Sequence, residues 1–157
     1  MTTLSQGDAA PDFTMTSNGG ATVSLADFAG SWLVLYFYPK DDTPGCTKQA
    51  IAFTEHQQDF ASLGVKILGV SKDTVAKHEK FAAKHELTIQ LGSDPEGAAC
   101  ESFGVWVEKK NYGRTYMGIE RTTFLIDPEG IISQIWPKVR AAGHVEKVLE
   151  TVRSQIN

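Results

Sequence analysis

One stretch of the chain constrains its fold more than any other: an uninterrupted apolar and aromatic run from Trp32 to Tyr38, followed by Pro39. A strand with one solvated face alternates apolar and polar residues, whereas a run without polar residues is typical of a strand buried on both faces. Such strands occupy the centre of sheets that helices cover on both sides. The run therefore predicts an α/β fold.

The segments around this run alternate between strand and helix patterns. Further strands are predicted over 65–70, 122–126 and 131–136, with weaker signals near Phe13, near Val23 and over 89–91. Helices are predicted over 46–63, 74–86, 94–104 and 145–156. The alternation favours parallel crossovers, and the late pair of strands favours an antiparallel edge. We expect one domain over 1–157: a mixed central sheet with helices on both faces, thioredoxin-like in outline.

Composition narrows the range of partners. The 15 basic and 19 acidic residues give a formal net charge of −4, which argues against a general nucleic-acid binder. No window is apolar for long enough to span a membrane. The first ten residues lack a basic start and an apolar stretch, so we expect no secretory signal. With only two cysteines, the chain is expected to be a cytoplasmic protein with reduced thiols.

The segment YPKDDTPGCT, which joins the buried strand to the next helix, carries the most informative residues. Cys46 falls in the first turn of that helix, where free backbone N–H groups and the helix dipole stabilise a thiolate over a thiol. Gly45 leaves space beside the sulfur, and Thr43 can place a hydroxyl near it. Pro39 and Pro44 stiffen the loop.

A buried structural role is the alternative for Cys46, because a free cysteine often behaves as a small apolar residue. A strand-to-helix turn with glycine before the cysteine is expected to expose the thiol instead. The pattern therefore favours a reactive cysteine.

This pattern resembles that of a known family. Pro39-x-x-x-Thr43-x-x-Cys46 is similar to the active-site motif of the peroxiredoxins, and YPKDDTPGCTKQA resembles their bacterioferritin comigratory protein, or peroxiredoxin Q, subgroup. The resemblance continues through 93–94, 103–106 and 118–127. It implies a thioredoxin fold and a cysteine-based peroxidase that needs no metal or cofactor. It also implies a hydroperoxide substrate and recycling by thioredoxin or another external thiol.

The resemblance also assigns roles to four residues. Cys46 matches the peroxidatic cysteine, whose thiolate attacks the O–O bond and becomes a sulfenic acid. Thr43 matches the hydroxyl that hydrogen-bonds the thiolate and the peroxide, and Pro39 matches the proline that shields the pocket. Arg121 matches the arginine that completes the site from a later strand; without the resemblance, a surface salt bridge would be the better interpretation.

The chain departs from the subgroup where a resolving cysteine is concerned. Members of the subgroup carry that second cysteine at positions that Ile51 and Ala82 occupy here. The remaining cysteine, Cys100, lies in a segment that looks like one face of a packed helix, which favours a buried inert thiol. We therefore expect a one-cysteine cycle with an external thiol as reductant. A two-cysteine cycle with Cys100 as the resolving residue is the alternative.

Two other functions compete with the peroxidase. Cys46 could act in hydrolysis or acyl transfer, which would require a histidine beside it as base. The chain could also be a thioredoxin-like binding or chaperone module with an idle thiol. The four histidines show no metal-binding spacing, and His78 and His85 are predicted to lie on a solvated helix surface. The region 106–116 is predicted to be a loop whose aromatic residues could line the pocket, and a monomer or weak homodimer is expected.

Overall fold

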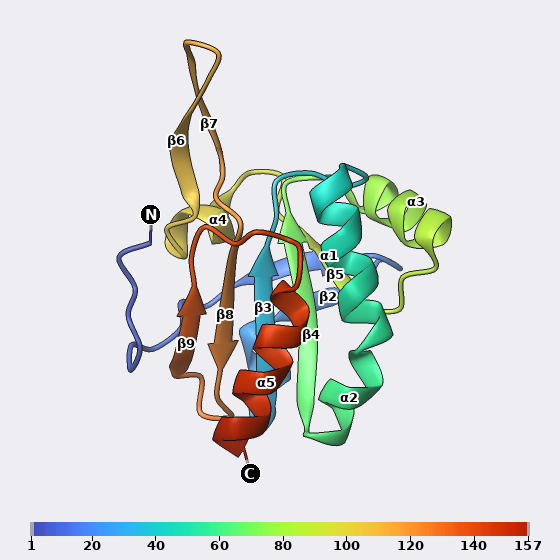
Figure 1. The fold of residues 1–157 in the computed structure, drawn as a ribbon, viewed down its shortest axis with the longest axis vertical. Helices are drawn as coiled ribbons and strands as arrows, with labels where there is room; N and C mark the ends of the chain where they lie inside the picture. Colours follow the sequence, from blue (N-terminus) through green and yellow to red (C-terminus); the bar gives the residue numbers. More distant parts are fainter. Residues whose placement is uncertain (1, 157) are drawn as a thin grey trace.

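A computed structural model describes residues 2–156 (Figure 1). Its strands are β1 (Thr14–Ser17), β2 (Thr22–Ser24), β3 (Trp32–Phe37), β4 (Val65–Ser71), β5 (Gln90–Ser93), β6 (Trp106–Asn111), β7 (Arg114–Ile119), β8 (Thr122–Ile126) and β9 (Ile132–Trp136). Its helices are the 3-10 helix η1 (Leu25–Phe28), α1 (Pro44–Glu55), α2 (Gln57–Ser62), α3 (Val75–His85), α4 (Ala98–Ser102) and α5 (His144–Ile156). None of these helices has the length and apolar character that a membrane span requires.

Seven strands form one mixed sheet in the order β2-β1-β5-β4-β3-β8-β9. The strands β3, β4 and β5 run parallel to one another, whereas β8 pairs antiparallel with β3 and β9 antiparallel with β8. The predicted central strand is thus at the centre, between β4 and β8, and all its residues after Trp32 are buried. The parallel crossovers and the antiparallel edge are as predicted.

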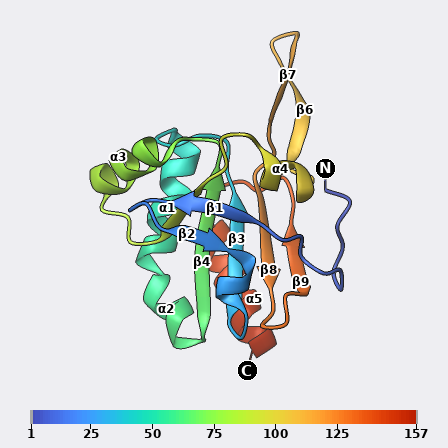
Figure 2. The ribbon, with the colours of Figure 1, turned by 180° about the vertical axis from the view of Figure 1, so that it is seen from behind.

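The sheet separates two apolar cores. Alternate residues of β3 enter them, with Leu33, Leu35 and Phe37 in one core and Val34, Tyr36 and the following Tyr38 in the other. Helices α1, α2, α3 and α5 cover the second core, and Figure 1 shows α1, α2 and α5 in front of the sheet. The N-terminal strands and α4 cover the first core, and β1 and β2 come to the front in Figure 2.

Three predicted elements differ from the structure. The helix predicted over 94–104 is limited to α4 (Ala98–Ser102), because a turn that ends at Gly97, with a positive φ of 80°, precedes it. The helix predicted over 46–63 is divided into α1 and α2 at His56, the residue that ends one helix and precedes the next. The region predicted as a loop near the pocket is the β6–β7 hairpin, which projects from the body (Figure 1). Tyr112 at its turn is 97% exposed, and Trp106 packs against the core on the α4 side. These aromatic residues therefore do not gather around Cys46.

The topology brings two distant segments together at one end of β3. In the antiparallel β3–β8 pair, Phe37 lies opposite Thr122. The last residue of β3 is therefore next to the first residue of β8. The loop that follows β3 leads to α1, and Arg121 immediately precedes β8. This register explains how residues far apart in sequence reach one site.

Candidate active site

Cys46 is the third residue of α1, as the sequence predicts. Thr43 is the N-cap and Pro44 the first helical residue, where a missing N–H costs no helical hydrogen bond. The first intrahelical bond runs from the Thr47 N–H to the Thr43 carbonyl at 2.8 Å. The expected exposure of the thiol is wrong, because Cys46 is only 1% exposed and belongs to the core beneath α1 and α5. Almost none of the Cys46 surface is therefore open to solvent.

Arg121 supplies the charged partner of this sulfur. Its Nη2 donates to the Cys46 Sγ at 3.3 Å, and its Nη1 donates to the Gln49 Oε1 at 2.8 Å. The guanidinium therefore faces the site instead of forming a surface salt bridge. Two separate donor atoms fix its plane, which a single contact would leave free to rotate.

Gln49 is a site residue that the sequence analysis missed. Its side chain is fully buried, and its Nε2 has no hydrogen-bond partner among residues 2–156. It follows Cys46 by three positions in α1, so the two side chains share a face of the helix. That spacing was the available signal, since a glutamine among apolar helix positions is rarely buried without a polar partner.

Gly45 keeps the space above the guanidinium open. A Cβ at this position would lie 3.1 Å from the Arg121 Nη2 and 3.9 Å from the Ala141 Cβ. A contact of 3.1 Å is tighter than carbon usually tolerates, so any larger residue would push the guanidinium away. The glycine before the cysteine thus makes room for the arginine.

Unlike Arg121, neither Thr43 nor Pro39 donates a hydrogen bond to the Cys46 sulfur in the described structure. The Thr43 hydroxyl donates to the Lys40 carbonyl at 2.9 Å, so its proton is engaged within the loop. Its oxygen keeps the capacity to accept a further hydrogen bond. Pro39 lies exposed at the start of the loop. Their predicted roles toward peroxide stay predictions.

Comparison with known proteins places this chain in a family. The AhpC/TSA family matches residues 6–135. The chain belongs to the AhpC/TSA family. It is 50% identical to a putative peroxiredoxin Bcp of Coxiella burnetii over 143 residues, which cover 91% of this chain and 95% of that protein. It is 48% identical to peroxiredoxin Bcp of Bacillus subtilis, with 96% of each chain covered.

Solved structures agree with this assignment. A cysteine-to-serine mutant of Xylella fastidiosa PrxQ matches with a TM-score of 0.95 and 35% identity over 100% of both chains. The bacterioferritin comigratory protein of Xanthomonas campestris matches with a TM-score of 0.91 and 42% identity, again over 100% of both chains. The expected thioredoxin-like fold and membership among the peroxiredoxins are thereby confirmed. The predicted activity, that of a thiol peroxidase, is confirmed as a class.

The second thiol of this AhpC/TSA protein lies in the other core. Cys100 is fully buried on the α4 side of the sheet, whereas Cys46 is on the α1 side. Burial raises the pKa of the Cys100 thiol far above its usual range, and a hydrogen bond with the Asp94 carboxylate raises it further. The same carboxylate accepts the backbone N–H groups of Ala99 and Cys100. Both thiols are free.

The histidines are engaged away from Cys46. Their ring nitrogens contact Asp59 (from His56), Asp41 (from His78), Asp42 (from His85) and the Thr123 hydroxyl (from His144). A nucleophile–base pair, which the hydrolase alternative requires, is therefore not formed among residues 2–156. The predicted solvated position of His78 is wrong, because its side chain is fully buried.

Burial lowers the pKa of His144 to about 4. Within the described residues, no group of three or more metal-binding side chains is found.

Proposed function

We propose that Cys46 is the peroxidatic nucleophile of this thiol peroxidase. Its thiolate attacks the terminal oxygen of a hydroperoxide, so that an S–O bond forms and the O–O bond breaks. The leaving oxygen takes a proton and departs as water or an alcohol, and Cys46 becomes a sulfenic acid. The contact of 3.3 Å between the Arg121 Nη2 and the Cys46 Sγ carries this proposal, because it aims a fixed cation at the reacting atom.

Arg121 stabilises the charge that moves during this displacement. Negative charge passes from the sulfur to the leaving oxygen, and a preorganised donor beside both lowers the barrier without reorganising. Gln49 holds the guanidinium in place through the Arg121 Nη1. The Thr43 hydroxyl donates its proton to the Lys40 carbonyl, so its oxygen is suited to accept a hydrogen bond from the hydroxyl group of the incoming hydroperoxide. Pro39 shields the pocket in this proposal.

The substrates proposed are hydrogen peroxide and organic hydroperoxides. The Xanthomonas campestris relative has been studied for alkyl peroxide reduction, which supports the second class. The proposed reductant is thioredoxin or another external thiol, which attacks the sulfenic sulfur, forms a mixed disulfide with Cys46 and releases water. A second thiol, in thioredoxin the other cysteine of its dithiol, then reduces this mixed disulfide and releases the Cys46 thiol. Two free thiols are consistent with a cytoplasmic enzyme, and a monomer or weak homodimer would suffice for this chemistry.

We further propose that the cycle uses one cysteine. The positions at which relatives carry a resolving cysteine hold Ile51 and Ala82, and Cys100 lies across the sheet from Cys46. A disulfide requires Cα atoms within about 7 Å. An internal disulfide between two opposite cores would therefore require the sheet or both helices to rearrange.

The deciding experiment is mass spectrometry after one equivalent of peroxide, with dimedone present and no reductant. We expect a dimedone adduct on Cys46 and a free thiol at Cys100. A loss of two hydrogens with a peptide that links Cys46 to Cys100 would instead support the two-cysteine cycle. An unmodified Cys46 would contradict its role as the peroxidatic nucleophile and favour an idle thiol at this position.

A further inference from the structure

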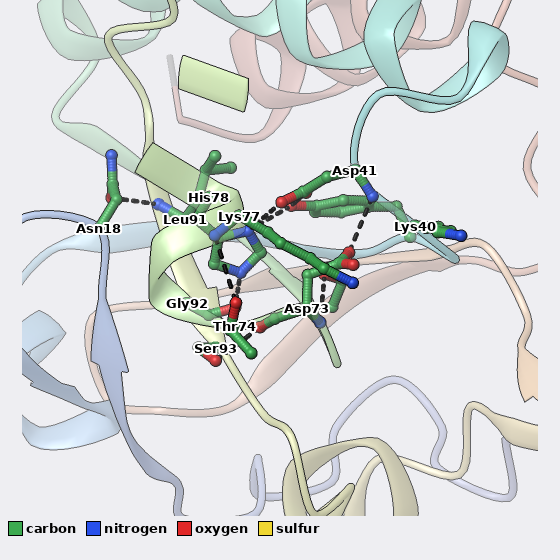
Figure 3. Close-up of polar contacts among 12 residues, drawn as sticks. Asn18, Lys40, Asp41, Asp73, Thr74, Lys77, His78, Leu91, Gly92 and Ser93 are labelled. Carbon is green, nitrogen blue, oxygen red and sulfur yellow. Dashed lines mark hydrogen bonds and ion pairs between the residues drawn. The ribbon is translucent and has the colours of Figure 1, made fainter. Parts of the chain in front are cut away.

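A buried polar cluster lies beneath the loop that leads to Cys46. The His78 Nδ1 of α3 lies 2.6 Å from the Asp41 Oδ2, and its Nε2 lies 2.9 Å from the Gly92 carbonyl oxygen of β5. The Tyr38 hydroxyl donates to the other oxygen of Asp41 at 2.6 Å. Figure 3 shows the Asp41 side chain turned toward the His78 ring. Helix α3, strand β5 and the loop after β3 therefore meet at one imidazole.

The partners of His78 define its hydrogen bonding. A carbonyl oxygen only accepts, so the Nε2 atom must carry a proton. The Nδ1 atom lies at hydrogen-bond distance from the Asp41 Oδ2, so one proton is shared between the imidazole and the carboxyl group. The cluster is thus a buried histidine–carboxyl pair whose close partners are hydrogen-bonded. Removing one member of such a pair leaves the other charged or polar group stranded in the core.

The backbone of the loop is held at the same residue. The Asp41 N–H donates to the Asp73 Oδ2 at 2.8 Å, and the Ser71 hydroxyl donates to the same atom at 2.7 Å. The Ser93 hydroxyl donates to the Asp73 carbonyl at 2.6 Å. Asp41 is therefore fixed by its side chain to α3 and by its backbone to Asp73, in the loop after β4, which Ser71 and Ser93 hold in turn (Figure 3).

Only two residues separate this anchor from the first helical residue. Asp42 has a positive φ of 61°, a conformation that few non-glycine residues adopt and that aspartate tolerates better than most, and it turns the loop toward α1. Thr43 follows as the N-cap of α1. The position of Asp41 thus sets where α1 begins and where Cys46, in its first turn, lies relative to Arg121.

We propose that His78 is a positioning residue for the nucleophile: through Asp41 it fixes the start of α1, and so the alignment of Cys46 with Arg121. This inference rests on the proposed peroxidatic role of Cys46. The proposal means that His78, which lies in α3 and not in the helix of Cys46, affects the rate of peroxide reduction. A displacement of about 1 Å at a reacting atom can cost a hundredfold in rate, so loss of the anchor has a measurable consequence.

The chain offers a matched control on the same two segments. The His85 Nε2 of α3 contacts the Asp42 Oδ1 at 2.8 Å, one residue further along the loop. This second pair lies at the surface, where the Asp42 side chain is 43% and the His85 side chain 21% exposed, and Lys84 also contacts the Asp42 carboxylate. Exposed pairs contribute little to stability. His85→Gln therefore removes the same kind of contact without disturbing the buried anchor.

The experiment uses two rates in the full chain. One is the rate of Cys46 oxidation by hydrogen peroxide in a single turnover, and the other is the rate of its reaction with a bulky aromatic disulfide. Peroxide requires an aligned site, whereas the disulfide reagent requires only access to a buried sulfur. The variants are His78→Leu, the nearly isosteric Asp41→Asn, the double variant and His85→Gln, each checked for folding by circular dichroism.

We expect peroxide oxidation to slow at least about tenfold in His78→Leu and less in Asp41→Asn, while the reaction with the disulfide becomes faster in both. The double variant is expected to be no slower than His78→Leu, because both changes break one anchor. His85→Gln should match the wild type. If His78→Leu does not fold, Asp41→Asn decides the question by the same pair of rates.

Folded variants with wild-type rates for both reagents would overturn the proposal and leave His78 a residue of stability only. Additive losses in the double variant, or a fall in both rates, would also overturn it. Failure of the proposed function is recognised separately, because wild-type Cys46 would then not react with peroxide at all.

Discussion

Cys46 and Cys100 occupy matching local positions and differ in what faces them. Each is the third residue of its helix, and each is almost completely buried. Cys46 receives a hydrogen bond from the Arg121 guanidinium, whereas Cys100 contacts the Asp94 carboxylate. A cation beside sulfur accommodates negative charge there, and a carboxylate opposes it. Burial and helix position are the same for both cysteines, so under the proposed function it is the charge that the sheet topology delivers to each sulfur that distinguishes them.

The comparison is tested most severely by exchanging each sulfur for oxygen. Cys46→Ser should reduce peroxide consumption to the uncatalysed background, because a serine hydroxyl stays protonated at neutral pH and is a poor nucleophile. Cys100→Ser should retain the wild-type rate of Cys46 oxidation. Both are measured as peroxide loss with a dithiol reductant in excess. Substantial turnover by Cys46→Ser, or none by Cys100→Ser, would reverse the assignment.

The charges beside the two sulfurs are the next target. Arg121→Ala removes a donor aimed at the reacting atoms, and the loss of one such donor costs about a hundredfold or more in rate. Asp94→Ala, which removes the charge beside Cys100, should leave the rate of Cys46 oxidation unchanged. Stopped-flow measurement of thiol oxidation compares the two variants. An unchanged rate in Arg121→Ala would show that Arg121 has a structural role and does not contribute to the oxidation of Cys46.

Gln49 is expected to have a smaller effect, since it acts through Arg121. Gln49→Leu keeps the volume of the side chain but removes the acceptor for the Arg121 Nη1. We expect the oxidation rate to fall about fivefold, which corresponds to ~1 kcal/mol for one hydrogen bond. Lys48→Ala, at the exposed neighbouring position, serves as control and should behave as the wild type. A loss as large as that of Arg121→Ala would mean that Gln49 itself contacts the reacting atoms.

Much of the fold follows from local sequence patterns. The run from Trp32 to Tyr38 predicts the central strand because burial on both faces leaves no polar position. Strand order was not predictable, because it depends on pairing between segments far apart in the chain. The β6–β7 hairpin was missed for a related reason: beyond Trp106 and Ile119, which pack on the core, its strands carry polar residues on both sides and are held by pairing with each other.

Site features that depend on residues next to Cys46 in the sequence were predicted, whereas features that depend on contacts between distant segments were missed or required the resemblance. The position of Cys46 at the start of α1 follows from Thr43, Pro44 and Gly45, which lie next to it in the chain. Arg121 required the family resemblance, since its approach depends on the β3–β8 register. The burial of His78 was missed because a lone histidine among lysines looks solvated, while its partner Asp41 lies in a different segment.

The smallest expected effect concerns the stability that the Cys100 thiol contributes at different pH values. Burial and Asp94 raise the pKa of this thiol in the folded chain, whereas an unfolded cysteine titrates near about 8.5. Its contribution is therefore fully present below about pH 8.5 and is lost as the pH rises, because only the unfolded state then releases the proton. At pH 9.5 the loss is roughly 1 kcal/mol. Urea denaturation with a phosphine reductant, between pH 7 and 9.5, measures the free energy of unfolding of the wild type and of Cys100→Ala. We expect the difference between them to shrink with rising pH; a constant difference would mean that the buried thiol ionises in the folded chain as easily as in water.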